Sequence, residues 1–207
     1  MDSEIWWDDV RTEFARAHDR PWTQDDQHAV MGANSAEWAA TMRARLQLDN
    51  VPADEIEDAI VDGVVERYRT EGAPTIPGAV EAVRRIAADR PVAIASSAHR
   101  AVIDAALEAT GLVDTFAVVV SSDEVEHGKP EPDVYLEAAR RLDAEPGSCL
   151  VVEDSYNGVR AARAAGMTVV LVPNASIPPA PGAEALADLV LARLADLDPD
   201  RVPAPAR

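Results

Sequence analysis

The chain has 207 residues and a formal charge of −18, with 19 Lys and Arg against 37 Asp and Glu. Its length suits one core domain with a small insert, and its acidity argues against nucleic acid as a partner. No apolar run approaches the ~18 residues that span a bilayer, and the single cysteine cannot form an internal disulfide. These features predict a soluble cytoplasmic protein, monomeric or homodimeric, with no membrane partner.

The first 76 residues have the pattern of helices alone. The predicted helices cover residues 5–17, 23–32, 35–48 and 53–70. Pro21 ends the first helix, and Thr23 and Ser35 are placed to cap the second and third. All four tryptophans lie in this segment, where we expect them to fill a core. The pattern therefore predicts a small helical domain over residues 1–76.

Beyond residue 76, strands alternate with helices. The predicted helices cover residues 78–88, 100–110, 132–142 and 156–165, and the predicted strands cover residues 91–95, 116–120, 149–152, 168–172 and 189–191. Such alternation is typical of a parallel sheet with right-handed crossovers. The predicted fold class is α/β, a doubly wound parallel sheet over residues 77–198. The Pro- and Ala-rich residues 199–207 are predicted to form a flexible tail.

Two adjacent carboxylates, Glu153 and Asp154, follow the apolar run at residues 149–152. Ligands of doubly wound folds bind beyond the carboxyl ends of the strands, where this pair is expected to lie. Paired hard oxygen ligands without a nearby His or Cys suit Mg²⁺ better than zinc. The alternative is that both residues only place favourable negative charge at the start of the next helix.

Two other predicted strands also lead into polar residues. Ser96 and Ser97 follow residues 92–95 and precede a helix, an arrangement that binds phosphate, although simple helix capping is the alternative. Lys129 lies between Gly128 and Pro130, so a stiff turn positions it. Its charge can neutralise a phosphate and the acid that attacks it, whereas a lone lysine on the surface is the alternative.

Hydroxyl, lysine and paired carboxylates, in that order along the chain, resemble motifs two to four of the haloacid dehalogenase superfamily. Residues 128–133 and 153–167 are similar to the branch that includes phosphoglycolate phosphatase and β-phosphoglucomutase. The resemblance implies a helical cap that closes over a Rossmann-like core. It also implies that Ser96 binds the transferring phosphoryl group, that Lys129 stabilises this group, and that Glu153 and Asp154 hold Mg²⁺.

The family's first motif, a strand that ends in Asp-x-Asp-Gly and leads into Val-Asp-Ser-Glu, has no full counterpart here. The chain begins Met1-Asp2-Ser3-Glu4, which matches only the tail of that motif. By resemblance, the first aspartate attacks phosphorus and the second is the general acid and base. We therefore expect both aspartates and their strand, the central one between those ending at Ser96 and Glu153, to be absent from these 207 residues.

The sequence thus predicts a Mg²⁺-dependent phosphatase that acts on a small phosphorylated metabolite, with Ser96, Ser97 and Lys129 at the phosphate, but inactive as this chain alone. A phosphomutase is one alternative. By resemblance, mutases carry a cap histidine and a cap arginine roughly where Trp7 and Ser35 stand here, which favours the phosphatase. The other alternative is a catalytically degenerate phosphate-binding protein.

Overall fold

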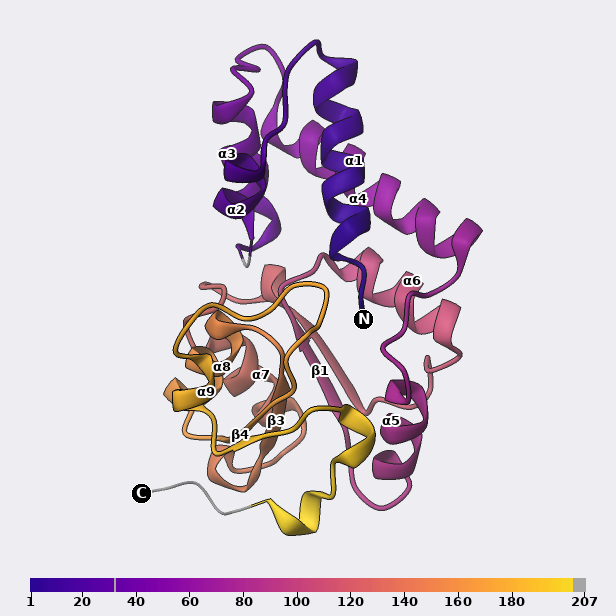
Figure 1. Ribbon diagram of the computed structural model, residues 1–207, viewed down its shortest axis with the longest axis vertical. Coiled ribbons are helices and arrows are strands. Elements are labelled where there is room, and N and C mark those ends of the chain that lie inside the picture. Colours follow the sequence, from indigo (N-terminus) through magenta and orange to yellow (C-terminus); the bar gives the residue numbers. More distant parts are fainter. Residues whose placement is uncertain (32, 203–207) are drawn as a thin grey trace.

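The computed structural model describes residues 1–31 and 33–202. Helices α1–α4 form an all-helical part, and the rest of the chain forms an α/β part beneath it (Figure 1). This arrangement confirms the predicted α/β fold with parallel strands and helices. The proposed domain boundary at residue 76 stays a prediction. No helix in the described part is both long and apolar enough to cross a bilayer.

The helical part follows the predicted pattern closely. Its helices are α1 (Glu4–Ala17), α2 (Gln24–Val30), α3 (Ser35–Arg45) and α4 (Ala53–Glu71). Thr23 caps α2 as predicted. The predicted cap at Ser35 is wrong, because Asn34 accepts from the Glu37 amide at 2.9 Å while Glu37 accepts from the Asn34 amide at 3.2 Å. This reciprocal capping box makes Ser35 the first helical residue instead.

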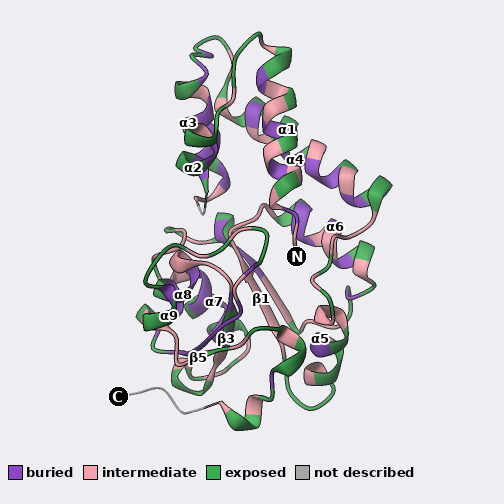
Figure 2. Cartoon of the chain, in the orientation of Figure 1, coloured by how far each residue is buried: buried purple, intermediate pink, exposed green. Residues whose placement is uncertain are grey.

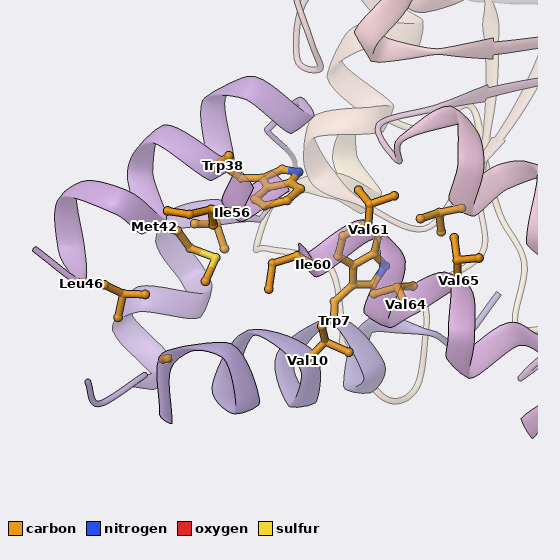
Figure 3. Close-up of a cluster of buried hydrophobic side chains, with 14 of the residues drawn as sticks. Trp7, Val10, Trp38, Met42, Leu46, Ile56, Ile60, Val61, Val64 and Val65 are labelled. Atoms are coloured by element: carbon orange, nitrogen blue, oxygen red, sulfur yellow. The ribbon is translucent and has the colours of Figure 1, made fainter. Parts of the chain in front are cut away.

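A hydrophobic core between these helices explains why they pack together. Figure 3 shows Trp7 from α1 and Trp38 and Met42 from α3 directed toward Ile60 of α4. Trp7 and Trp38 are buried, as predicted, whereas Trp6 and Trp22 are only partly buried against the same core. The tryptophans therefore divide between the interior and the rim of the helical part. Figure 2 shows that buried and exposed residues both occur along these helices.

The α/β part contains short parallel strands connected by helices. The strands are β1 (Ala93–Ser96), β2 (Val118–Ser121), β3 (Leu150–Glu153), β4 (Thr168–Leu171) and β5 (Leu189–Val190). The helices are α5 (Ala79–Ala87), α6 (Arg100–Thr110), α7 (Asp133–Arg141), α8 (Tyr156–Ala164) and α9 (Ala183–Leu186). Each predicted strand is present, with bounds shifted by at most two residues.

The strands form two separate sheets in the described residues, with orders β1-β2 and β3-β4-β5. Between them lies a cavity of about 730 Å³, hereafter the slot, whose walls include Ala93 and Ala95 of β1 and Val151 and Val152 of β3. Helix α7 bridges the two sheets, since Ala138 packs in one apolar cluster with residues of both. Val152 remains 40% exposed although an apolar strand residue is normally covered.

The segment after residue 198 makes local contacts with the α/β part. Pro199–Arg201 form a 3₁₀ turn, Arg90 pairs with Asp200 at 3.0 Å, and Val202 packs against the cluster around Val170. These contacts join residues 199–202 to the α/β part, and the flexibility expected for residues 199–207 stays a prediction. Residues 203–207 lie outside the described residues.

Candidate active site

A cavity of about 510 Å³ lies between the helical part and the carboxyl ends of β1 and β3. The residues predicted from sequence to form a site all line it: Ser96, Ser97, Lys129, Glu153 and Asp154. Side chains of the helical part close its other side: Trp7, Arg11, Trp38 and Tyr68. The structure therefore brings together residues from three separate segments of the α/β part beneath a helical cover.

The serines occupy the end of β1, as predicted, but they do not adjoin a helix N-terminus. Helix α6 begins at Arg100, and its cap is His99, whose Nδ1 accepts from the Ala101 amide at 3.2 Å. Ser96 instead stabilises the loop that follows β1, since its Oγ accepts a hydrogen bond from the Ala98 amide at 3.1 Å. Hydroxyl and amide groups of this loop, rather than a helix end, are the anion-binding groups available on this side of the cavity.

Glu153 is buried and accepts hydrogen bonds on both carboxylate oxygens. Its Oε1 accepts from Lys129 Nζ at 2.5 Å and from the Tyr135 hydroxyl at 2.6 Å. Its Oε2 accepts from the Asp154 amide at 3.1 Å, the Ser155 amide at 3.1 Å and the Ser155 hydroxyl at 2.9 Å. These donors occupy the lone pairs that a metal ion would need.

Gly158 makes this position of Glu153 possible. A Cβ atom added at residue 158 would lie 1.9 Å from Glu153 Cδ, far inside van der Waals contact. The Glu153 carboxylate therefore rests directly on the backbone of the first turn of α8. Only glycine allows that approach, which explains the choice of residue five positions beyond the carboxylate.

Lys129, the only lysine of the chain, connects the two sheets at the end of the slot. Besides Glu153 at the end of β3, its Nζ contacts the Ala95 carbonyl oxygen of β1 at 3.2 Å and lies 4.8 Å from the centre of the Tyr135 ring. Burial alone favours the neutral amine, but the Glu153 carboxylate outweighs it and raises the pKa of Lys129. Lys129 therefore carries a fixed positive charge into the cavity.

Asp154 differs from its neighbour in having no cation partner. No ion pair to it is found among the described residues. Burial raises the pKa of its carboxyl group, and the nearby Glu153 charge raises it further. A bound cation would relieve both effects. Since the other cavity carboxylates are Glu4 and Glu153, the available ligands are hard oxygens of the kind that Mg²⁺ prefers.

The helical cover is hydrogen-bonded to the α/β part through residues that sequence reasoning missed. Asp123, just after β2, accepts from the Ser35 amide and from the Ser35 hydroxyl, both at 2.9 Å. These bonds supply an acceptor for the first turn of α3, whose amides have no partner within the helix. A long-range contact of this kind leaves no periodic signal in the sequence.

Another set of potential ligands lies at the same junction. Glu57, His99 and Asp123 present ligand atoms within 4.8 Å of one another. However, Nδ1 of His99 accepts from the Ala101 amide, so the neutral ring carries its proton on Nε2, which lies 4.0 Å from Glu57. Such a ring donates toward a carboxylate and is unsuited to bind a metal through the same nitrogen.

The buried pair predicts a specific acid sensitivity. Burial raises the pKa of Glu153, but Lys129 and the other donors outweigh burial and lower it from 4.5 to about 2. The stabilisation is therefore present above the unfolded value of 4.5 and lost as pH falls toward 2. We expect the free energy of unfolding, measured by urea titration, to decline over this window.

The Glu153→Gln variant should lose less free energy of unfolding between pH 4.5 and 2 than the unmodified chain, because it has no carboxylate at this position to protonate. Glu137→Gln is the matched control, because Glu137 also has a pKa of about 2 but is partly exposed, at surface pairs with Arg140 and Arg141. Its removal should change the pH profile much less, since water screens exposed pairs. Equal effects of both variants would contradict the importance of the buried pair.

Residues 3–166 of the chain match a family of hydrolases, the haloacid dehalogenase-like hydrolases. The bifunctional riboflavin kinase/FMN phosphatase of Arabidopsis thaliana is 32% identical over 91% of this chain and 49% of its own length. Fructose-1-phosphate phosphatase YqaB of Escherichia coli is 41% identical over 44% of this chain and 48% of its own length. The chain thus spans about half the length of these relatives.

Among solved structures, CbbY from Rhodobacter sphaeroides in complex with phosphate is similar in fold. The TM-score is 0.76 at 25% identity, covering 94% of this chain and 90% of the other. The match therefore extends over both the helical and the α/β parts.

Proposed function

Because the chain belongs to the haloacid dehalogenase-like hydrolase family, we propose that it is a Mg²⁺-dependent phosphatase for a small phosphorylated metabolite. One observation carries this proposal: anion-binding groups and an unpaired carboxylate share a single covered cavity. The relatives named for phosphatase activity toward FMN and fructose 1-phosphate support it. Cytoplasmic location and a monomeric or homodimeric state remain predictions.

Each site residue has a proposed role. The phosphoryl group lies against Ser96 and Ser97, and Lys129 neutralises part of its charge. Asp154 would hold Mg²⁺, which would supply further positive charge at the phosphoryl group when bound. Glu153, first assigned as a second metal ligand, instead fixes Lys129 and receives donors from α8. We therefore propose Glu153 as a positioning residue and Asp154 as the ligand.

The nucleophile is the remaining requirement. The carboxylates that line the cavity are Glu4, Glu153 and Asp154, and none is an aspartate in an Asp-x-Asp-Gly context. We propose that turnover needs a further strand in the slot, ending in Asp-x-Asp. Its first aspartate attacks phosphorus, the ester oxygen leaves with a proton from the second, and water then hydrolyses the phospho-aspartate. Residues 1–207 alone should bind phosphate without turnover.

Inorganic phosphate tests the proposed anion site directly. At 100 times its dissociation constant, phosphate should stabilise the folded chain by about 2.7 kcal/mol, seen as a higher melting temperature. A variant that combines Ser96→Ala with Ser97→Ala should lose most of this protection. Ser148→Ala, outside the cavity, is the control. Undiminished protection in the double variant would exclude the serines from the site.

Calorimetric titration with Mg²⁺ tests the metal site. Asp154→Asn should weaken Mg²⁺ binding at least about tenfold, because it removes the charge of the proposed ligand. Asp196→Asn, at an exposed pair with Arg193, is the control and should bind as the unmodified chain does. Equal affinity in the Asp154 variant would remove Asp154 from the site.

The alternatives differ in what they require. A phosphomutase needs a proton-transferring cap residue, but the places of the expected histidine and arginine are held by buried Trp7 and by Ser35, which binds Asp123. A degenerate phosphate-binding protein would retain phosphate protection and stay inactive even with the slot filled. Adding the further strand with its two aspartates separates such a protein from a phosphatase, because only the phosphatase would gain activity.

A further inference from the structure

A buried arginine on the cover of the active-site cavity has no anionic partner. Arg11 of α1 is 5% exposed, yet its side chain lines the same cavity as Ser96 and Lys129. Among the described residues, its hydrogen bond is from Nη1 to Gln27 Oε1 at 3.2 Å, and its Nε is buried without any acceptor. A guanidinium has five N–H donors, so most of this group's capacity is unused.

The surroundings hold this guanidinium in a fixed orientation. Its central carbon lies 5.0 Å from the Trp7 ring centre and 5.3 Å from the Trp38 ring centre. The two indoles meet edge to face at 6.1 Å, so they form a rigid corner around the charge. Because the planar guanidinium is already held in one orientation, it loses little conformational entropy when it binds an anion.

The nearest negative charges do not neutralise Arg11. The Glu4 and Asp8 carboxylates of the same helix favour its charged form, but no carboxylate of the described chain lies within 4.0 Å of it. Burial dominates and lowers the pKa of Arg11 to about 10, which still leaves it charged at neutral pH. An unpaired buried charge is destabilising, so its position facing a cavity points to a ligand that completes it.

We propose that Arg11, held by Trp7 and Trp38, forms a second anion subsite in the cap. It would take a carboxylate or a second phosphate of the substrate. The inference rests on the proposed function, since the transferring phosphoryl group lies at the Ser96–Lys129 side of the cavity. The preferred substrate class is then a small metabolite with a phosphate at one end and another anionic group at the other. Arginine suits that second group because its donors match two oxygens at once.

The test compares ligands with one and with two anionic ends. Binding of pentane-1,5-diol bisphosphate, pentan-1-ol monophosphate and inorganic phosphate is measured by calorimetry on the full chain. The unmodified chain should bind the bisphosphate at least about tenfold more tightly than the monophosphate, as a charge-assisted pair allows. Propane and hexane bisphosphates in the same series locate the best spacing.

Arg11→Met, of similar volume, should reduce that preference to less than about threefold while inorganic phosphate binds as before. Its melting temperature without ligand should not fall, because replacing an unpaired buried charge by an apolar group is often neutral or stabilising. Arg11→Lys keeps the charge without the planar fork and should show an intermediate preference. Arg45→Met removes an equal charge from an exposed pair with Asp26 and serves as control.

The outcomes separate the two proposals. If inorganic phosphate binds but the bisphosphate has no advantage, or if Arg11→Met weakens all three ligands equally, the second subsite is overturned and the phosphatase proposal stands. If the unmodified chain binds none of the three ligands, both are overturned. A lower melting temperature in Arg11→Met, with the preference intact in Arg11→Lys and Arg11→Met, identifies Arg11 as a packing residue only.

Discussion

Replacing Lys129 by methionine should lower the free energy of unfolding by about 3–5 kcal/mol, because the variant leaves the Glu153 charge buried without its partner. Both side chains are less than one tenth exposed, so water cannot screen the loss. The variant also removes the contact that joins the Ala95 carbonyl of β1 to the end of β3. Urea denaturation at neutral pH measures the change.

Two further variants sharpen this test. Lys129→Met combined with Glu153→Gln should recover much of the lost stability, since no uncompensated charge then remains in the interior. Arg90→Met is the control, because it breaks an exposed ion pair with Asp200 that should contribute less than about 1 kcal/mol. If Lys129→Met is no more harmful than Arg90→Met, the bridging role of Lys129 is wrong.

Filling the slot should have an even larger effect. The slot separates the facing edges of β1 and β3, where strand amides and carbonyls have no partner strand among the residues that the structure describes. Each unsatisfied buried polar group costs about 1–3 kcal/mol, and each new backbone hydrogen bond contributes roughly 1 kcal/mol. An apolar strand fused ahead of Met1 should therefore raise the melting temperature by about 10 °C or more. Met1 lines the same cavity as Asp154, so the fused strand would end beside the site.

With Asp-x-Asp-Gly at the end of that strand, the fused protein should hydrolyse p-nitrophenyl phosphate when Mg²⁺ is present. Chelation of the metal by EDTA should abolish this hydrolysis. The same fusion with both aspartates changed to asparagine is the matched control, and it should gain the stability without the activity. Vigorous hydrolysis by residues 1–207 alone would overturn the need for a further strand. A stable fusion that binds phosphate but remains inactive would support the degenerate binding protein.

Local patterns in the sequence predicted the elements well because each pattern has a local cause. The apolar run at residues 149–152 is β3, and the stripe through residues 53–70 is α4, since periodicity of 2 and 3.6 residues reports directly on burial. Ser155 caps α8 by accepting from the Gly158 amide at 3.0 Å. The capping error at Ser35 arose because Asn34, one position earlier, satisfies the same amides through a reciprocal bond.

The site was predicted in composition but not in geometry. Sequence placed Glu153 and Asp154 together, but it could not show that Glu153 turns toward Lys129 and Tyr135 while Asp154 stays unpaired. That division depends on the close approach at Gly158, which only coordinates reveal. Arg11 had no distinguishing signal, because a basic residue on an amphipathic helix is ordinarily solvated. Its burial follows from how α1 and α3 pack.

The position of Cys149 gives this chain a built-in chemical reporter. It is the only cysteine, it is partly exposed, and it lines the slot beside β3. A thiol reagent such as a maleimide therefore modifies the folded chain at this one side chain, and mass spectrometry can follow the reaction without an engineered label. Burial raises the pKa of the Cys149 thiol, so alkaline buffer increases the reactive thiolate. Any segment that enters the slot must slow this labelling, which turns a question about strand pairing into a measurable reaction rate.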